Sequence, residues 1–71
     1  MDIQAIRSYF LFLKAVMSRG DLQNLLGISQ TTFYKFALDL FAGETLPEGK
    51  AMRRLFELYS KETFNKDDIG A

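Results

Sequence analysis

The stretch that decides the fold runs from Ser18 to Phe36 and reads SRGDLQNLLGISQTTFYKF. Leucines at positions 22, 25 and 26 fit one face of a short helix, and phenylalanines at 33 and 36 fit one face of the next. Between them, Gly27 stands where a tight turn requires a positive φ, and Ser29 is placed to cap the second helix. The pattern therefore predicts a helix over 19–26, a sharp turn, and a second helix that begins at residue 30.

The start of the first of these helices has two interpretations. The segment Ser18-Arg19-Gly20-Asp21 fits a capping box, in which the Ser18 hydroxyl accepts from the amide of Asp21 and the carboxylate reaches back. Alternatively, Gly20 closes the preceding helix in a left-handed conformation, and Asp21 caps the next one. Both interpretations place a helix boundary within about two residues of Ser18.

The segment before Ser18 is predicted to be a helix over 2–17 with two apolar surfaces. One stripe at helical spacing faces the core and consists of Ile3, Ile6, Phe10, Leu13 and Met17. A second apolar surface consists of Tyr9, Leu11, Phe12 and Val16. This second surface is explained either by burial at the centre of a bundle or by contact with another subunit.

Two further helices complete the prediction. The second helix of the central stretch extends over 30–42, and a loop with Gly43 and Pro47 separates it from a helix over 48–62. The last residues are polar and lack periodicity, so 1–64 is predicted to form the domain and 65–71 a flexible tail. The expected fold class is all-α, a compact domain of four helices.

Composition narrows the range of functions. The 71-residue chain has no Cys and no His, which removes disulfides, thiolate or imidazole catalysis, and the usual zinc ligands. It also lacks a phosphate-binding glycine loop, so we expect no enzymatic activity, no metal and no cofactor. The N-terminus lacks a secretory pattern, and Lys14 interrupts the apolar run 9–13 well short of a membrane span. We expect a cytoplasmic protein of a bacterium or a phage-infected cell, with no membrane contact.

The segment 21–36 resembles the helix-turn-helix of the lambda-repressor and Cro-like superfamily of phage and bacterial regulators. The resemblance rests on Gly27 in the turn, Ser29 as cap, and apolar residues that lock the two helices together, namely Leu22, Leu26, Ile28, Phe33 and Phe36. It extends downstream to Gly43, Pro47, Met52, Leu55 and Phe56. Two features differ from the usual pattern: Gln23 stands where the family usually has Ala, and 37–42 adds about one helical turn.

The resemblance implies a double-stranded DNA-binding transcription regulator whose second motif helix enters the major groove. Transferred by position, the residues expected to contact bases or phosphates are Ser29, Gln30, Thr31, Tyr34 and Lys35. Gln30 is the first candidate for specificity, because Gln can form two hydrogen bonds with adenine. The candidates for additional phosphate contacts are Arg19, Lys50, Arg53 and Arg54. The alternative interpretation is that each of these residues is an ordinary solvent-exposed surface residue without a role in DNA binding.

Charge and symmetry complete the expectations. One such domain covers a half-site, so a homodimer is expected, and the interface candidates are Leu11, Phe12, Leu58, Tyr59 and Phe64. Nine basic and nine acidic residues give a net charge of zero, whereas DNA-binding proteins usually have a basic excess. The charge keeps an alternative open: a protein-interaction module, such as a phage inhibitor or adaptor, that uses the same fold without binding DNA.

Overall fold

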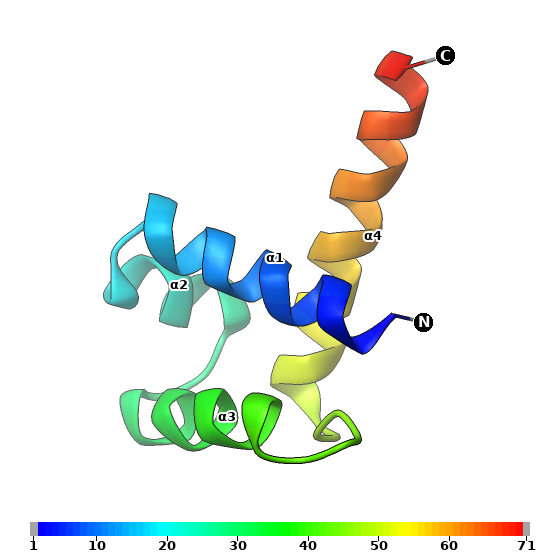
Figure 1. Cartoon of the computed structure of the whole chain (residues 1–71). Helices are drawn as coiled ribbons and strands as arrows, with labels where there is room; N and C mark the ends of the chain where they lie inside the picture. Colours follow the sequence, from blue (N-terminus) through cyan, green and yellow to red (C-terminus); the bar gives the residue numbers. More distant parts are fainter. Residues whose placement is uncertain (1, 71) are drawn as a thin grey trace.

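The chain folds into four helices arranged around one core, as the computed structural model shows (Figure 1). The structure describes the backbone of residues 2–70 and the side chains of 2–62. The helices are α1 (Ile3–Val16), α2 (Arg19–Leu26), α3 (Gln30–Ala42) and α4 (Lys50–Gly70), and the described residues contain no strand. The all-α, four-helix fold class predicted from the sequence is confirmed. Across the described residues, no helix combines the length and apolarity that a membrane crossing requires.

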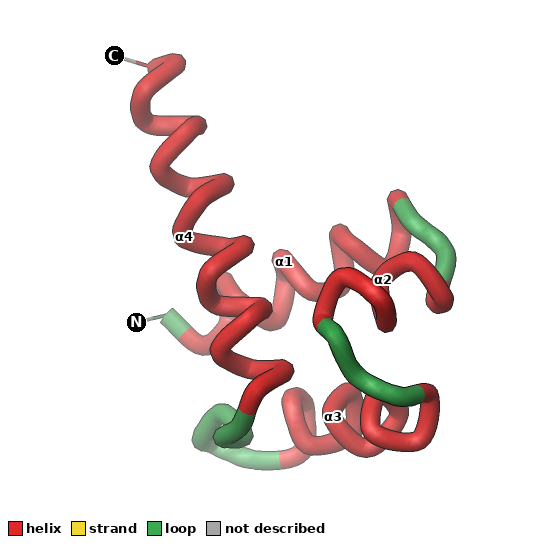
Figure 2. The backbone as a smooth tube through the Cα atoms, turned by 180° about the vertical axis from the view of Figure 1, so that it is seen from behind, coloured by secondary structure: helices red, strands yellow, loops and turns green. Residues whose placement is uncertain are grey.

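Helix α2 lies at the junction of the other elements. It packs against α1, α3 and α4, and α1 also crosses α4. Figures 1 and 2 show α3 at one end of the molecule, while the second half of α4 projects away from it at the opposite end. The beginning of α3 and the end of α4 are therefore well separated.

The observed helix limits agree with the sequence prediction in the central stretch and differ at the last helix. Helices α2 and α3 have the predicted limits, and α1 is one residue shorter at each end. Helix α4 begins at Lys50 because Gly49 has a φ of 128°, which is incompatible with a helix. Its backbone continues to Gly70, beyond the predicted end at residue 62, since neither Pro nor Gly interrupts 62–69. The flexibility expected of 65–71 stays a prediction.

The two serines of the central stretch act as helix caps. Ser18 Oγ accepts a hydrogen bond from the amide of Asp21 at 3.1 Å, so Ser18 caps α2 and Gly20 lies inside that helix. Ser29 Oγ accepts from the amide of Thr32 at 3.3 Å and caps α3 in the same way. Each cap satisfies an amide that has no partner within its own helix.

The turn between α2 and α3 consists of residues 27–29 and depends on Gly27. Gly27 adopts the left-handed conformation with a φ of 70°. Its N–H donates to the carbonyl of Asn24 at 3.1 Å, and that of Ile28 donates to the carbonyl of Gln23 at 3.3 Å. This pair of bonds is a Schellman motif, which ends α2 abruptly and redirects the chain into α3.

The core is centred on Phe10 of α1, which is completely buried. Its ring lies 6.1 Å from that of Phe33, 5.8 Å from that of Phe36 and 6.2 Å from that of Phe41. These aromatic contacts hold α3 against α1. Besides Phe10, Phe33 and Phe36, the buried apolar residues are Ile6, Leu13, Leu22, Leu26, Leu40, Ala51, Met52 and Leu55. Burial of one side of α3 leaves its opposite side facing solvent.

Arg7 fixes the far end of α3. Its Nε donates to the carbonyl of Leu40 at 2.7 Å and its Nη2 to the carbonyl of Gly43 at 2.6 Å. The same guanidinium lies 5.9 Å from the centre of the Phe41 ring. A positive group at the C-terminal end of a helix satisfies free carbonyls and complements the helix dipole. Arg7 therefore has a structural role on the side of α3 that faces α1.

Candidate nucleic-acid interface

The first two turns of α3 carry an exposed polar surface. Phe33 and Phe36 turn into the core, so the residues between and before them face outward. The residues brought together on this exposed surface are Ser29, Gln30, Thr31, Tyr34 and Lys35. All five positions expected to contact DNA are thus exposed and lie on consecutive turns of one helix.

Arg19 at the start of α2 reaches this surface through Tyr34. Arg19 Nη1 donates to the Tyr34 hydroxyl at 2.5 Å, and the guanidinium lies 5.6 Å from the centre of the Tyr34 ring. The hydrogen bond from Arg19, followed by one from Gln30, lowers the pKa of the Tyr34 phenol. The contact joins α2 to α3 along an exposed edge and holds a guanidinium beside the polar surface.

Lys35 has an acidic neighbour one helical turn away. Its Nζ lies 3.6 Å from Asp39 Oδ2, and both side chains are largely exposed. An exposed pair of this kind contributes at most a few tenths of a kcal/mol. A phosphate group can therefore compete with Asp39 for the ammonium group.

Lys50 lies on the other side of the α3 start, beside the turn. A Cβ built on Gly27 would lie 4.0 Å from Lys50 Nζ, which places this ammonium group next to the turn. A hollow between α3 and the loop before α4 brings together basic, acidic and hydroxyl side chains, including Lys35, Asp39, Glu48, Lys50 and Thr32. Cations therefore flank the start of α3 on both sides, with Arg19 on one side and Lys35 with Lys50 on the other.

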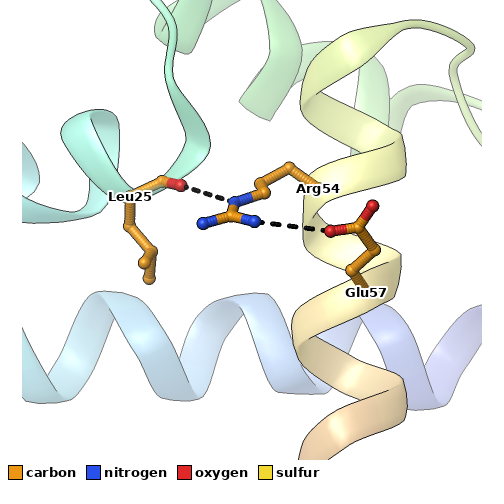
Figure 3. A network of polar contacts seen from close by, with 3 residues as sticks. All are labelled: Leu25, Arg54 and Glu57. Carbon is orange, nitrogen blue, oxygen red and sulfur yellow. Dashed lines mark hydrogen bonds and ion pairs between the residues drawn. The ribbon is translucent and has the colours of Figure 1, made fainter.

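A second basic hollow lies between the end of α2 and the start of α4. It is lined by Asn24, Leu25, Leu26, Gly27, Lys50, Arg53, Arg54 and Glu57. Within it, Arg54 Nε donates to the carbonyl of Leu25 at 3.2 Å, and Arg54 Nη1 lies 3.4 Å from Glu57 Oε2 (Figure 3). Arg54 thus connects α4 to the C-terminal carbonyls of α2. Sequence reasoning treated it only as a phosphate candidate, because a contact across 29 positions leaves no local signal.

The candidates for a dimer interface differ in exposure. Leu11 is 52% exposed and Phe12 is also exposed. Leu58 and Tyr59 are half-buried against the core, and the Tyr59 ring lies 5.6 Å from that of Tyr9. The side chain of Phe64 lies outside the described residues.

The structure leaves two apolar residues of α3 exposed: Phe41, whose spacing with Phe33 and Leu40 predicted burial on the apolar stripe of this helix, and Leu38, which the prediction did not cover. Leu38 is 73% exposed and Phe41 is 42% exposed. Both line an apolar groove between α1 and α3, together with Phe10, Leu11, Lys14, Tyr34, Ala37 and Ala42. Leu38 was detectable in principle, since a leucine at this position lies off the stripe formed by Phe33, Phe36 and Leu40.

Comparisons of the chain with protein-family models, with curated proteins and with solved structures gave no match. The description of this molecule therefore comes from its own structure. It is a small all-helical domain of four helices, with a polar helix surface flanked by cations. Any functional conclusion depends on that geometry.

Proposed function

We propose that this chain is a non-catalytic, sequence-specific regulator that binds double-stranded DNA, with the start of α3 in the major groove. One observation carries the proposal: α2 and α3 are joined by a three-residue turn that leaves the polar start of α3 exposed between cations. Such a helix pair, with its second helix facing outward, matches the arrangement by which helix-turn-helix proteins read DNA.

The residues on this surface suit the two kinds of contact that recognition requires. The major groove is about 12 Å wide and admits an α-helix. Gln30 offers an amide that can form two hydrogen bonds with an adenine edge, and Thr31 offers a hydroxyl and a methyl group. Arg19, Lys35 and Lys50 flank these residues and can contact phosphates on both strands.

The zero net charge of the chain is compatible with this role because the cations are concentrated locally. Four of them, Arg19, Lys35, Lys50 and Arg53, lie around the start of α3 and the adjoining hollow. If each of the four neutralises one phosphate, the slope of log Kd against log salt concentration is about 3.6, because each phosphate contributes about 0.9. The affinity then falls about a hundredfold between 50 mM and 200 mM salt.

A fluorescence anisotropy titration of a labelled mixed-sequence duplex at these two salt concentrations tests the proposal. We expect Lys35→Ala to lower the slope by about 0.9, because one phosphate contact is lost. Lys61→Ala is the matched control, since it removes the same exposed charge from the part of α4 that projects away from α3. Duplex binding that is absent at 50 mM salt, or that does not depend on salt, contradicts the proposal.

Binding to a single half-site is weak, so the proposal includes a homodimer on a short palindromic operator, as in repressors of phages, plasmids and bacteria. Occupancy of the operator would then block transcription. Analytical ultracentrifugation with and without operator DNA tests this part, with two chains per duplex as the expected stoichiometry.

A second function is favoured by the apolar groove between α1 and α3. Leu11, Leu38 and Phe41 expose apolar surface there, and monomeric domains seldom leave large contiguous apolar patches uncovered. Under this alternative the chain is a protein-interaction module, and the groove rather than the start of α3 contacts the partner. Failure of duplex DNA to bind at 50 mM salt favours the module over the regulator.

A further inference from the structure

The outermost line of α3 carries uncharged rather than cationic groups. Phe33, Phe36 and Leu40 define the buried side of the helix. At 100° per residue, the positions directly opposite that side are Thr31 and Leu38, which lie two turns apart. A DNA groove that receives α3 would meet these two side chains most directly.

Leu38 is the most exposed large apolar side chain among the described residues, with 73% of its surface accessible. Its side chain contributes to the groove between α1 and α3 but lies mostly outside the core. The folded domain therefore gains little from Leu38 itself. An apolar group that projects from a DNA-reading helix is suited to one feature of the major groove, the C5-methyl group of thymine.

The same helix lacks the residues that read guanine best. Arg, and to a lesser extent Lys, forms paired hydrogen bonds with O6 and N7 of guanine. Helix α3 contains no Arg, and its one Lys, Lys35, is directed toward Asp39 at 3.6 Å. Gln30, by contrast, has the amide that pairs with N6 and N7 of adenine.

We infer that the base pairs facing α3 are A·T pairs, with Gln30 bound to an adenine and with Thr31 and Leu38 in contact with thymine methyl groups. The inference rests on the proposed function and specifies its target. Positions 31 and 38 are separated by about 10 Å along the helix axis, at about 1.5 Å per residue. This separation corresponds to about three base pairs at 3.4 Å each.

Replacement of thymine by uracil tests the inference directly, because it removes the methyl group and leaves the Watson–Crick edge unchanged. The probes are three labelled duplexes of equal length: one rich in A·T pairs, the same duplex with uracil for every thymine, and one rich in G·C pairs. We expect the uracil duplex to bind roughly fifteenfold more weakly than the thymine duplex, the loss expected for removal of about two buried methyl groups. The G·C duplex should bind at least as weakly, with the same salt slope.

Two variants test whether the preference for thymine over uracil depends on Leu38. Leu38→Ala should prefer the thymine duplex only about fourfold, since its own methyl contact is lost and that of Thr31 remains. Val16→Ala is the control, because Val16 is also apolar and is 61% exposed but lies on α1. It should keep the wild-type preference. Circular dichroism verifies folding of both variants, which is expected because both sites are exposed.

The outcomes separate the inference from the proposed function. If all three duplexes bind with equal affinity and a steep salt dependence, DNA binding by the chain stands and the A·T assignment is wrong. If no duplex binds, the proposed function itself fails. If Leu38→Ala keeps the full wild-type preference for thymine, Leu38 does not contact a methyl group, and the assignment of this residue is overturned.

Discussion

Substitution of Gly27 by Ala tests the turn that orients α3. The left-handed conformation costs an L-residue roughly 1–2 kcal/mol, and Gly27 has a φ of 70°. A Cβ at this position would lie 3.8 Å from Lys50 Cε, an ordinary contact, so the cost comes from the backbone and not from a clash. We expect Gly27→Ala to lower the free energy of unfolding by about 1 kcal/mol and the Tm by about 4–8 °C.

Gly20→Ala provides a control with the opposite sign. Gly20 lies inside α2, and a Cβ there would meet nothing within 4 Å. Alanine is a better helix former, so this variant should gain about 0.5 kcal/mol. Urea denaturation followed by circular dichroism measures both variants, and their m-values should match wild type. A Gly27→Ala variant as stable as wild type would refute the left-handed turn, and with it the orientation of α3.

Three further predictions concern the cap, the exposed edge and the core. Ser29→Ala removes the acceptor of the Thr32 amide and should cost about 1 kcal/mol in urea denaturation; an unchanged midpoint would contradict the cap. The Tyr34 phenol should ionise below its usual pKa, and Arg19→Ala should raise that pKa, as ultraviolet absorbance against pH measures; an unchanged titration would contradict the contact. Phe10→Ala removes the central ring and should cost about 3–5 kcal/mol, enough to unfold so small a domain; a native circular dichroism spectrum would contradict that role.

The central stretch was predictable because its signals are local. Ser18, Gly27 and Ser29 act on amides and carbonyls within a few positions of themselves. Sequence patterns record such contacts directly, because the residue type at the cap or turn determines the backbone conformation. The limits of α2 and α3 followed from these three residues.

The features that the sequence did not predict depend on contacts between distant segments. Arg7 binds carbonyls at the end of α3, and Arg54 binds a carbonyl at the end of α2. No spacing rule indicates which distant carbonyl an arginine will reach. The predicted limits of α4 were wrong for two reasons. The backbone conformation of Gly49 places the start of the helix at Lys50, and its polar second half lacks the apolar periodicity on which the prediction relied.

The sequence predicted which residues belong to the candidate site, but it did not predict how they are arranged in space. The sequence placed Tyr34 and Arg19 on separate helices, and only the fold brings them within hydrogen-bond distance. Leu38 lies off the apolar stripe of its helix and was not considered, and Phe41, which its spacing placed on that stripe, is exposed.

The most direct test of the central claim is a titration of the ¹⁵N-labelled protein with duplex DNA at 50 mM salt, followed residue by residue in amide NMR spectra. We predict that the largest shifts occur over 29–38 and at Arg19 and Lys50, while the second half of α4 changes little. Shifts confined to the groove between α1 and α3, or no shifts at all, would contradict the claim that the start of α3 binds DNA.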